Sequence, residues 1–380
     1  MNPITIIGSG FAAYQLVKTI RRMNAEVPIR IITADKGHDY NKPDLSHVVS
    51  KQQTAEDLIT SKADDFVQQH NIELCAEHLV SEINPQLKVV VANGKNYEYS
   101  SLVMATGAKP FMPPIEGLKE SAPITLNSLQ EFEEFRDRLT SAKSILVIGG
   151  GLIGVEISMD LALSDKKVTV VEAAPRLMAN QLPEFIGLKL DQGMQKLNVD
   201  VKLGQGVKQV AKTDTGFMVT LAHGDVVYVD EVLVCTGLIP NTVLASEAGI
   251  STNRGICVDD AMQTSCEDIY ALGDCAEQNG QVRAYLQPTV ISASSLAKTL
   301  LGERTSVVLP NMMVKVKTPS YPIQLGGTTT DSVVARWNLD IHADGIVAKA
   351  YNDDDTMIGF IATEDKTKQA FPLLRELSTQ

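Results

Sequence analysis

Two short glycine clusters are the residues whose types and spacing point most clearly to chemistry. Residues 8–13 (GSGFAA) and residues 149–154 (GGGLIG) each follow an apolar stretch and precede a helical pattern. In such a cluster the first glycine permits a tight turn and the second lets the backbone approach a pyrophosphate. The third small residue lets the helix pack closely on the strand. The pyrophosphate would bind the unpaired N–H groups at the helix N-terminus, so each cluster predicts a dinucleotide site.

An acidic residue follows each cluster at the spacing that such sites require. Asp35 closes the apolar stretch 29–33, and Glu172 closes the stretch 167–171. Each carboxylate could accept hydrogen bonds from adenosine ribose hydroxyls. Glu172 would also repel a 2′-phosphate, which favours NADH over NADPH, although Arg176 lies four residues further on. The glycines could instead be ordinary turns between strand and helix, but two copies with matched acidic residues favour the dinucleotide interpretation.

The elements that must position these residues form a repeat. Apolar stretches 4–7 and 144–148 precede the clusters, and two later stretches, 102–107 (LVMATG) and 232–237 (VLVCTG), end in a small-Thr-Gly turn. Each copy is typical of a βαβ unit with a parallel sheet. We therefore predict an α/β protein with two doubly wound, Rossmann-like dinucleotide-binding domains of three layers. The predicted nucleotide contacts are Gly8, Ser9, Gly10, Phe11, Ala13, Ala34, Asp35, Thr106 and Gly107 in the first copy, and Gly149, Gly151, Gly154, Glu172 and Gly237 in the second.

One of the two dinucleotides is expected to be a flavin. An apolar stretch, 269–272, leads into Gly273 and Asp274. A carboxylate at that place suits a ribityl chain with several hydroxyls, although the bare pattern could also be a turn in which Asp274 caps a helix.

The remaining pattern divides the chain. Prolines and a glycine at 110–117 indicate a crossing between domains. After residue 310, short β-rich pieces (312–316, 323–325 and 346–350) precede a helical pattern near 366–377, which indicates a small α+β domain. The predicted domains are residues 1–110 with 238–309 for FAD, residues 111–237 for NAD, and residues 310–380 for the flavin edge and partner docking.

Composition excludes several classes of function. The 380 residues carry a net charge of −12 and five cysteines, and 44% of them are hydrophobic. Nucleic acid is not expected as a partner, because phosphate binding needs a surplus of Lys and Arg. No membrane span is expected, since the longest nearly apolar stretch, 145–157, contains four glycines and is shorter than the ~20 residues required. Without a secretory signal or a C-x-x-C pair, we expect a cytoplasmic protein with free, buried cysteines and no metal site.

Four further motifs carry a resemblance to a known family: residues 40–47 (YNKPDLSH), 253–255 (NRG), 274–277 (DCAE) and 316–319 (VKTP). With them the whole chain resembles the two-dinucleotide flavoprotein reductases, which include ferredoxin reductases and apoptosis-inducing factor. It is most similar to the rubredoxin reductases, and among them to members that serve a nitric-oxide-reducing flavodiiron protein.

The resemblance implies that FAD is held by the first glycine cluster with Lys42, Val80 and Asp274, and that Leu286 and Lys317 lie beside the flavin ring. Glu156 matches a carboxylate near flavin and nicotinamide. In ferredoxin reductases this glutamate pairs with a lysine at the position held here by His47, so Lys42 could supply the positive charge instead.

The catalytic candidates from this resemblance are Lys42, Glu156 and Lys317. Lys42 could instead be a surface residue, and Glu156 a solvated or helix-capping one. The Trp-Ser pair that ferredoxin reductases carry near the flavin is replaced here by residues 316–318. The one tryptophan, Trp337, is expected to pack rather than to react.

The predicted function follows from electron counting. NADH gives two electrons together as hydride, whereas iron centres accept them singly, and a flavin converts between the two. The resemblance implies that the acceptor is the rubredoxin domain of a flavodiiron protein (a flavorubredoxin), in nitric oxide detoxification. No cysteine precedes Cys75, so no thiol lies near the expected flavin-facing segment and a disulfide substrate is not expected.

Two alternatives stay open: a [2Fe–2S] ferredoxin as acceptor in an oxygenase system, and an NADH-sensing interaction flavoprotein. Because rubredoxins are typically acidic, docking would need a locally basic face. The candidates are Lys315, Lys317, Lys366, Lys368 and Arg375, each of which could equally be a solvated surface residue.

Overall fold

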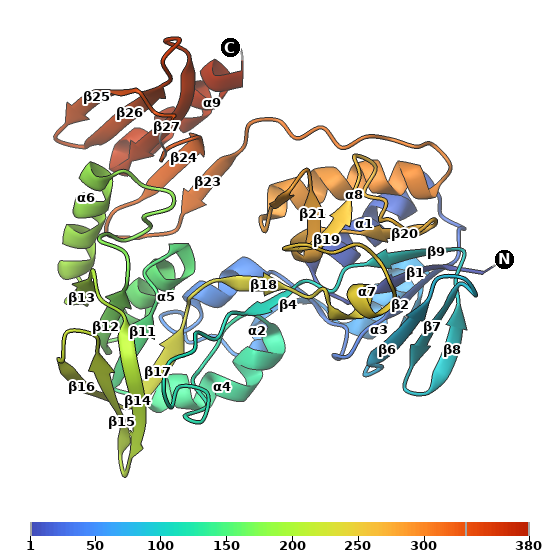
Figure 1. Ribbon diagram of the computed structural model, residues 1–380, viewed down its shortest axis with the longest axis horizontal. Coiled ribbons are helices and arrows are strands. Elements are labelled where there is room, and N and C mark those ends of the chain that lie inside the picture. The colour runs from blue at the N-terminus through green and yellow to red at the C-terminus, as the bar shows by residue number, and fades with distance from the viewer. Residues whose placement is uncertain (1, 331–332, 379–380) are drawn as a thin grey trace. The chain divides into compact units, whose positions relative to one another are not determined.

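The computed structural model describes residues 2–330 and 333–378, and its contacts divide the chain into two compact units (Figure 1). The first unit runs up to Pro43 and includes Ala55–Lys109 and Leu238–Leu309. The second contains Asp44–Thr54, Pro110–Gly237 and the chain from Pro310 onward. Residues 44–54, which the sequence analysis assigns to the first domain, thus group with the second unit. They do so because their backbone amides and buried side chains bind that unit.

A parallel sheet forms the centre of the first unit. Its strand order is β20 (Ile269–Ala271), β9 (Ser101–Met104), β1 (Ile4–Ile7), β2 (Ile29–Ile32) and β5 (Glu73–Cys75). Every residue of β1 is buried, as expected for a parallel sheet covered on both faces. Helices α1 (Phe11–Met23) and α8 (Leu286–Leu300) pack against each other, and the same core includes residues of a small antiparallel sheet. That sheet consists of β6 (Val80–Asn84), β7 (Val89–Ala92) and β8 (Lys95–Glu98).

Short elements complete the first unit. They are β3 (Asp39–Tyr40), α2 (Ala55–Leu58), β4 (Ile59–Ser61), α3 (Ala63–His70), α7 (Val243–Glu247), β19 (Ile256–Val258), η2 (Gly273–Cys275), β21 (Ala276–Gln278) and β22 (Gln281–Val282). The 3₁₀ helix η1 (Lys42–His47) and the paired strands β10 (Ala108–Pro110) and β18 (Leu238–Pro240) lie where the chain changes unit.

The second unit repeats the parallel arrangement. Its sheet has the order β13 (Asp200–Leu203), β12 (Lys167–Glu172), β11 (Ser144–Ile148) and β17 (Glu231–Val234). The remaining elements of this part are α4 (Leu129–Ser141), α5 (Leu152–Ala162), α6 (Glu184–Gln195), β14 (Val207–Thr213), β15 (Gly216–Leu221) and β16 (Val226–Val229). In both units the strands around the glycine cluster pair in parallel, which confirms the two predicted βαβ units.

The C-terminal part of the second unit contains an antiparallel sheet. Its order is β23 (Met313–Val316), β24 (Ile323–Gly327), β27 (Met357–Thr363), β26 (Gly345–Tyr351) and β25 (Arg336–His342). The 3₁₀ helix η3 (Glu364–Gln369) and α9 (Ala370–Ser378) follow, and α9 packs on the sheet over its own apolar cluster (Figure 1). The predicted helix near 366–377 thus becomes α-helical only from residue 370. Strands β25 and β27 were not predicted.

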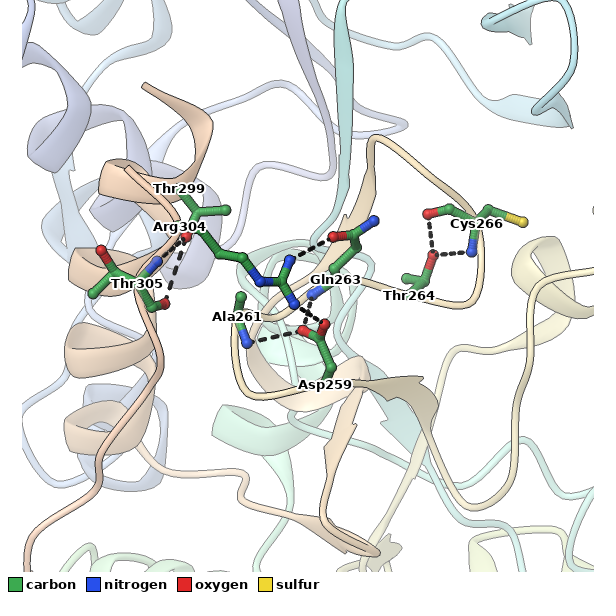
Figure 2. Close-up of polar contacts among 8 residues, drawn as sticks. All are labelled: Asp259, Ala261, Gln263, Thr264, Cys266, Thr299, Arg304 and Thr305. Atoms are coloured by element: carbon green, nitrogen blue, oxygen red, sulfur yellow. Dashed lines mark hydrogen bonds and ion pairs between the residues drawn. The ribbon is translucent and has the colours of Figure 1, made fainter. Parts of the chain in front are cut away.

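A cluster of polar contacts closes the loop after β19 onto the end of α8 (Figure 2). Asp259 Oδ1 accepts hydrogen bonds from the amides of Ala261 (2.8 Å) and Gln263 (2.9 Å), and its other oxygen pairs with Arg304. Burial acts to raise the pKa of Asp259, but the Gln263 amide and the Arg304 guanidinium outweigh it and hold that pKa below its ordinary value. The ion pair is exposed and worth little alone, so the backbone bonds are what fix the loop.

The cysteines are free thiols, and their burial varies. Cys275 is buried, whereas Cys75, Cys235, Cys257 and Cys266 are only partly so. The expectation of uniformly buried cysteines is therefore wrong for four of the five. Among the described residues, no helix combines the length and apolar character that a membrane crossing requires.

Candidate functional site

The first glycine turn joins β1 to α1 and has the geometry of a phosphate cradle. Gly8 has a φ of +106°, and a Cβ there would lie 2.4 Å from the carbonyl oxygen of Ala105 on the neighbouring strand's extension. Gly10 is the N-cap of α1, which has no side-chain cap, and a Cβ on Gly10 would meet nothing within 4 Å. The start of α1 therefore has no side-chain cap and has open space beside Gly10, which fits a bound pyrophosphate.

Asp35 follows β2 and is fixed by three hydrogen bonds to one carboxylate oxygen. Oδ1 accepts from Ser9 Oγ (2.6 Å), Thr33 Oγ1 (3.0 Å) and the Gly37 amide (2.8 Å). Ser9 thus ties the glycine turn to the acidic residue. Of the other predicted contacts in this copy, Ala13 is fully buried, Phe11 is partly buried and Ala34 is exposed.

The second glycine turn joins β11 to α5 and repeats the first. Gly149 has a φ of +109°, and a Cβ there would lie 2.4 Å from the carbonyl oxygen of Cys235. A Cβ on Gly154 would lie 2.0 Å from the carbonyl oxygen of Gly149, so only glycine fits that close packing. Gly151 is the N-cap of α5, again with no side-chain cap and nothing within 4 Å of a built Cβ.

Glu172 ends β12 and faces this turn. Its Oε2 accepts from the Gly150 amide (2.6 Å), and its Oε1 accepts from the Ala174 amide (2.7 Å). Arg176 donates its guanidinium to the carbonyl oxygens of Leu182 (2.9 Å) and Ala179 (3.2 Å). The Arg176 guanidinium is therefore used within this loop, which favours a structural role over binding of a 2′-phosphate.

The two small-Thr-Gly turns brace the chain where it changes unit. Thr106 Oγ1 donates to the Asn241 carbonyl (3.0 Å), and the Asn241 amide donates to the Gly107 carbonyl (2.9 Å). Thr236 Oγ1 donates to the Phe111 carbonyl, which completes the same pattern around Gly237. The side chain of Thr106 is thus used in this brace.

Two predicted flavin contacts meet within the first unit. Lys42 Nζ lies 3.5 Å from Asp274 Oδ2, with the two side chains 33% and 24% exposed, so both remain accessible to a ligand. Val80 lies at the start of β6 and Leu286 is the first residue of α8; both are partly buried. Their roles toward FAD stay predictions.

Glu156 is the centre of a second cluster, within the second unit. It lies on α5 and is 4% exposed. Oε2 accepts from Ser46 Oγ (2.8 Å) and Oε1 accepts from the Lys317 backbone amide (2.8 Å). Lys317 Nζ lies 3.9 Å from Asp44 Oδ1. The interpretation of Glu156 as solvated is therefore wrong, because a buried carboxylate must be hydrogen-bonded and this one is.

His47 stands where ferredoxin reductases carry the lysine that pairs with this glutamate. Its Nε2 lies 4.0 Å from Glu156 Oε2, beyond hydrogen-bond distance, and is buried with no hydrogen-bond partner. Burial lowers the pKa of His47, and Glu156 opposes that effect only in part. The imidazole is therefore neutral at pH 7, and no permanent cation faces the glutamate from this position.

Two further buried carboxylates have defined hydrogen-bond partners: Asp160, which the sequence analysis did not single out, and Glu277, which it named only within the 274–277 motif. Asp160 lies on α5 four residues after Glu156, is 2% exposed, and accepts from the Val49 amide (2.9 Å). Glu277 is 4% exposed and accepts from the Gly255 amide (2.7 Å) and Asn253 Nδ2 (2.8 Å). The signal for Asp160 was its charge inside the apolar helix sequence LIGVEISMDLA.

Most of the predicted basic docking residues are paired with acids. Lys366 lies 3.2 Å from Asp344, and Lys368 lies 3.3 Å from Asp365. Lys315, on β23, is exposed. Three of the five predicted docking residues, Lys317, Lys366 and Lys368, thus have an acidic partner that offsets part of their positive charge.

Four of the five thiols have a pKa above the ordinary value, opposite to that of a reactive cysteine. Burial raises the pKa of Cys75, Cys257 and Cys275, and raises that of Cys235 to about 12. Reactive thiols have lowered pKa values, so this supports the prediction that electrons do not pass through sulfur. Trp337 packs edge-on against Phe185 with ring centroids 5.4 Å apart, as expected for a packing residue.

Two family models match the chain. One is described as pyridine nucleotide-disulphide oxidoreductase and matches residues 2–294, and the other is described as rubredoxin binding C-terminal domain and matches residues 306–377.

Curated relatives match along the whole length. A protein from Aliivibrio fischeri named nitric oxide reductase FlRd-NAD(+) reductase is 50% identical over 377 residues, covering 99% of each chain. A protein of the same name from Vibrio vulnificus is 51% identical and covers 99% of this chain and 98% of its own. A third, from Escherichia coli O157:H7, is 44% identical and covers 99% of each chain.

Solved structures share the fold, as predicted. A ferredoxin reductase from Rhodopseudomonas palustris has a TM-score of 0.89 and 25% identity, covering 100% of this chain and 96% of its own. An NADH:rubredoxin oxidoreductase from Clostridium acetobutylicum has a TM-score of 0.81 and 19% identity, covering 100% and 95%.

Proposed function

Since this chain belongs to the pyridine nucleotide-disulphide oxidoreductase family, and within it to the nitric oxide reductase FlRd-NAD(+) reductases, we propose that it transfers electrons from NADH through FAD to the rubredoxin centre of a flavorubredoxin. The observation that carries this proposal is one chain with two complete glycine turns and a C-terminal segment that matches a rubredoxin-binding domain. The first unit binds FAD, the 111–237 segment binds NADH, and residues 310–380 meet the partner.

FAD, when bound, accepts two electrons together and returns them singly. The residues that would hold it are those of the first turn. Gly8 and Gly10 leave room for the pyrophosphate at the start of α1, and Asp35 accepts from the adenosine ribose. Lys42 and Asp274 then present one positive and one negative charge to the rest of the cofactor.

NADH would be held by the second turn in the same way. The carboxylate of Glu172 is placed by two backbone amides, so it accepts from ribose hydroxyls and repels a 2′-phosphate. Glu156 and Lys317 would serve the nicotinamide end of the site: the buried carboxylate holds the Lys317 backbone amide, and the lysine would supply positive charge there.

The location of the chain is proposed to be the cytoplasm. Five free cysteines support this, because thiols persist unpaired in reducing compartments.

Acceptor choice tests the function. The enzyme reduced by one equivalent of NADH is mixed in a stopped-flow instrument with a flavorubredoxin rubredoxin domain, with a [2Fe–2S] ferredoxin, or with neither. We expect reoxidation at least about tenfold faster with the rubredoxin domain, a preference of about 1.4 kcal/mol. Faster reoxidation by the ferredoxin would favour an oxygenase component, and slow reoxidation with both carriers would favour a sensor.

Docking is tested at Lys315, which is exposed on the C-terminal domain. Lys315→Glu should raise the KM for the rubredoxin domain by roughly three- to tenfold, since charge at a rim acts on encounter. Reduction of ferricyanide should stay unchanged. Lys368→Glu is the matched control, because Lys368 is already paired with Asp365. Equal loss with both acceptors would refute a docking role.

A further inference from the structure

Helix α5 buries two carboxylates on one face. Glu156 and Asp160 are 4% and 2% exposed and stand one helical turn apart. Like charges at this spacing repel, and a buried carboxylate is costly unless it is hydrogen-bonded. Their joint presence therefore needs partners that bind both, and the structure supplies them.

Both carboxylates bind the segment 44–54. Asp160 accepts from the Val49 amide (2.9 Å), from the Ser50 amide (3.3 Å), and from Ser50 Oγ in a short hydrogen bond. Glu156 accepts from Ser46 Oγ (2.8 Å). The segment also buries the apolar side chains Leu45, Val48 and Val49.

The far end of this segment is held by a different element. Arg136 Nε, on α4, donates to the Gln53 carbonyl (3.4 Å). The chain enters the segment from Pro43, one residue after Lys42, and leaves it at Ala55. Asp160 is thus the main anchor in the middle of the segment, between Ser46 and Gln53.

We propose that Asp160 is a positioning residue for electron transfer from NADH: it holds residues 46–50 against α5 and so keeps the Ser46 hydroxyl on Glu156. The inference rests on the proposed function, because it gives Glu156 a role in that reaction. Among the described residues, Asp160 makes no direct hydrogen bond to Glu156, Lys317 or His47. Asp160 therefore holds the Ser46 hydroxyl through the segment, while its charge also acts on His47 through space.

Asp160→Asn turns one of the two acceptor oxygens into a donor, so the Val49 amide, the Ser50 amide and the Ser50 hydroxyl can no longer all donate to this side chain. An unpaired buried donor is costly, so the turn shifts to find another partner. Ser46 then leaves Glu156, whose carboxylate keeps only the Lys317 amide. A carboxylate held by one bond instead of two has more freedom, and small misplacement at a reacting centre slows the reaction.

A double-mutant cycle tests the proposal. The rate constant for flavin bleaching by NADH and the Kd for NADH are measured in Asp160→Asn, Glu156→Gln and the double variant. We expect Asp160→Asn to slow bleaching roughly tenfold with Kd within about twofold, and to slow it less than about twofold in the Glu156→Gln background, as for coupled neighbours. Ser158→Ala is the matched control, because Ser158 is buried on the same helix but donates only to Gly154 (2.6 Å).

Ser50→Ala provides a milder variant should Asp160→Asn fail to fold. Ser50 is exposed, and the substitution removes only its hydroxyl bond. We expect a loss of roughly two- to threefold that also vanishes in the Glu156→Gln background. The same factor in both backgrounds, or unchanged bleaching in both variants, would overturn the proposal. A wild-type enzyme that NADH does not bleach would instead refute the proposed function.

Discussion

The two glycine turns are nearly identical where they meet the strands. Gly8 and Gly149 have φ values of +106° and +109°, and a Cβ on either would lie 2.4 Å from a carbonyl oxygen, that of Ala105 or of Cys235. Neither following helix has a side-chain cap. The two turns thus share the positive-φ glycine and the uncapped helix start, which are the features that pyrophosphate binding requires.

The turns differ in how the acidic residue is attached. Asp35 is bonded to the Ser9 hydroxyl (2.6 Å), whereas Glu172, longer by one methylene, reaches the Gly150 amide directly (2.6 Å). A Cβ at residue 150 would lie 2.7 Å from Leu177 Cδ2 and 3.0 Å from Glu172 Cβ, so a side chain there would have to displace Leu177. The shorter Asp35 thus binds the turn through a serine hydroxyl, and the longer Glu172 binds it through a glycine amide.

The helices after the turns differ more. Helix α1 buries one apolar face and ends in Arg21 and Arg22, as a helix with one solvent face does. In α5 every residue from Gly154 to Leu161 is buried, including two carboxylates. The second copy therefore does more than bind a nucleotide: its helix also holds segment 44–54 and the Lys317 amide.

The largest expected effect is the loss of a different ligand when the first glycine of each turn is replaced. Gly8→Ala and Gly149→Ala each place a methyl group against a backbone carbonyl at a positive φ. We expect Gly8→Ala to weaken FAD binding on the order of 100-fold, or about 2.7 kcal/mol, and Gly149→Ala to weaken NADH binding similarly while keeping FAD. Flavin content after gel filtration and NADH titration measure both.

Gly280→Ala is the control for these variants, since Gly280 has a φ of +72° but nothing within 4 Å of a built Cβ. It carries the backbone strain without the overlap, so both ligands should bind normally. If Gly8→Ala and Gly149→Ala lose both ligands equally, the assignment of one dinucleotide to each turn is wrong.

The next effect concerns the two acidic residues. Glu172→Gln removes the charge that opposes a 2′-phosphate, so the NADH preference in kcat/KM should fall about tenfold, or about 1.4 kcal/mol. Asp35→Asn should leave that preference unchanged, although it weakens FAD binding. Steady-state kcat/KM values with NADH and with NADPH, measured for both variants, test this difference.

Arg176→Gln sharpens this test. Its guanidinium donates to the Leu182 and Ala179 carbonyls, so we expect lower thermal stability with an unchanged nucleotide preference. A change in preference after this substitution would mean that Arg176 leaves its carbonyl partners to meet the nucleotide.

The features that could be predicted from sequence are those that local chemistry dictates. The turns at Gly8 and Gly149 need glycine for steric reasons that hold in any context, and runs such as 144–148 are buried strands by composition alone. The antiparallel strands were harder to predict. Strand β25, RWNLDIH, is mostly exposed, so it lacks the apolar pattern of a buried strand. Its position is set by pairing with β26, and a short sequence window does not show that pairing.

The site was predictable only where one residue acts alone. The family resemblance pointed to Glu156, but its hydrogen bonds to Ser46 and Lys317 join residues 110 and 161 positions away. No local pattern shows that Asp160 receives the amides of residues 49 and 50. The helix near 366–377 starts late because Glu364 adopts a φ of +51° and a 3₁₀ turn follows it.

A smaller effect is expected on the pH dependence of Tm, from His47 near α5 and His70 near α1. His47 faces Glu156, Asp160, Lys317 and Lys51, and burial is the largest cause of its lowered pKa. A histidine with a lowered pKa in the folded state favours folding while it is neutral. Its contribution to the free energy of unfolding is complete above the ordinary pKa of 6.5 and is lost as the pH falls through the folded-state pKa. His47→Gln should therefore reduce the fall in Tm between pH 7 and pH 5, as thermal melts across this range would show.

His70 is the matched comparison for this pH effect. Burial again lowers its pKa most, but its nearest charges include Lys18 and Arg21 of α1, which lower the pKa further. His70→Gln should flatten the same acid loss, and salt should weaken the effect at His70, where cations contribute. A pH profile of Tm unaltered by either substitution would show that neither histidine is buried neutral.

The smallest effect is expected from Cys235→Ala, a substitution that makes the second turn resemble the first. Cys235 occupies the position that Ala105 holds in the first copy, and each supplies the carbonyl oxygen that faces the turn glycine. Burial raises the pKa of Cys235 to about 12, so its thiol carries no charge at neutral pH. Cys235→Ala should therefore leave turnover with NADH within about twofold and cost no more than about 1 kcal/mol, the scale of a small apolar deletion. A large loss of turnover without loss of NADH binding would mean that the second turn uses sulfur chemistry that the first turn, with alanine, cannot have.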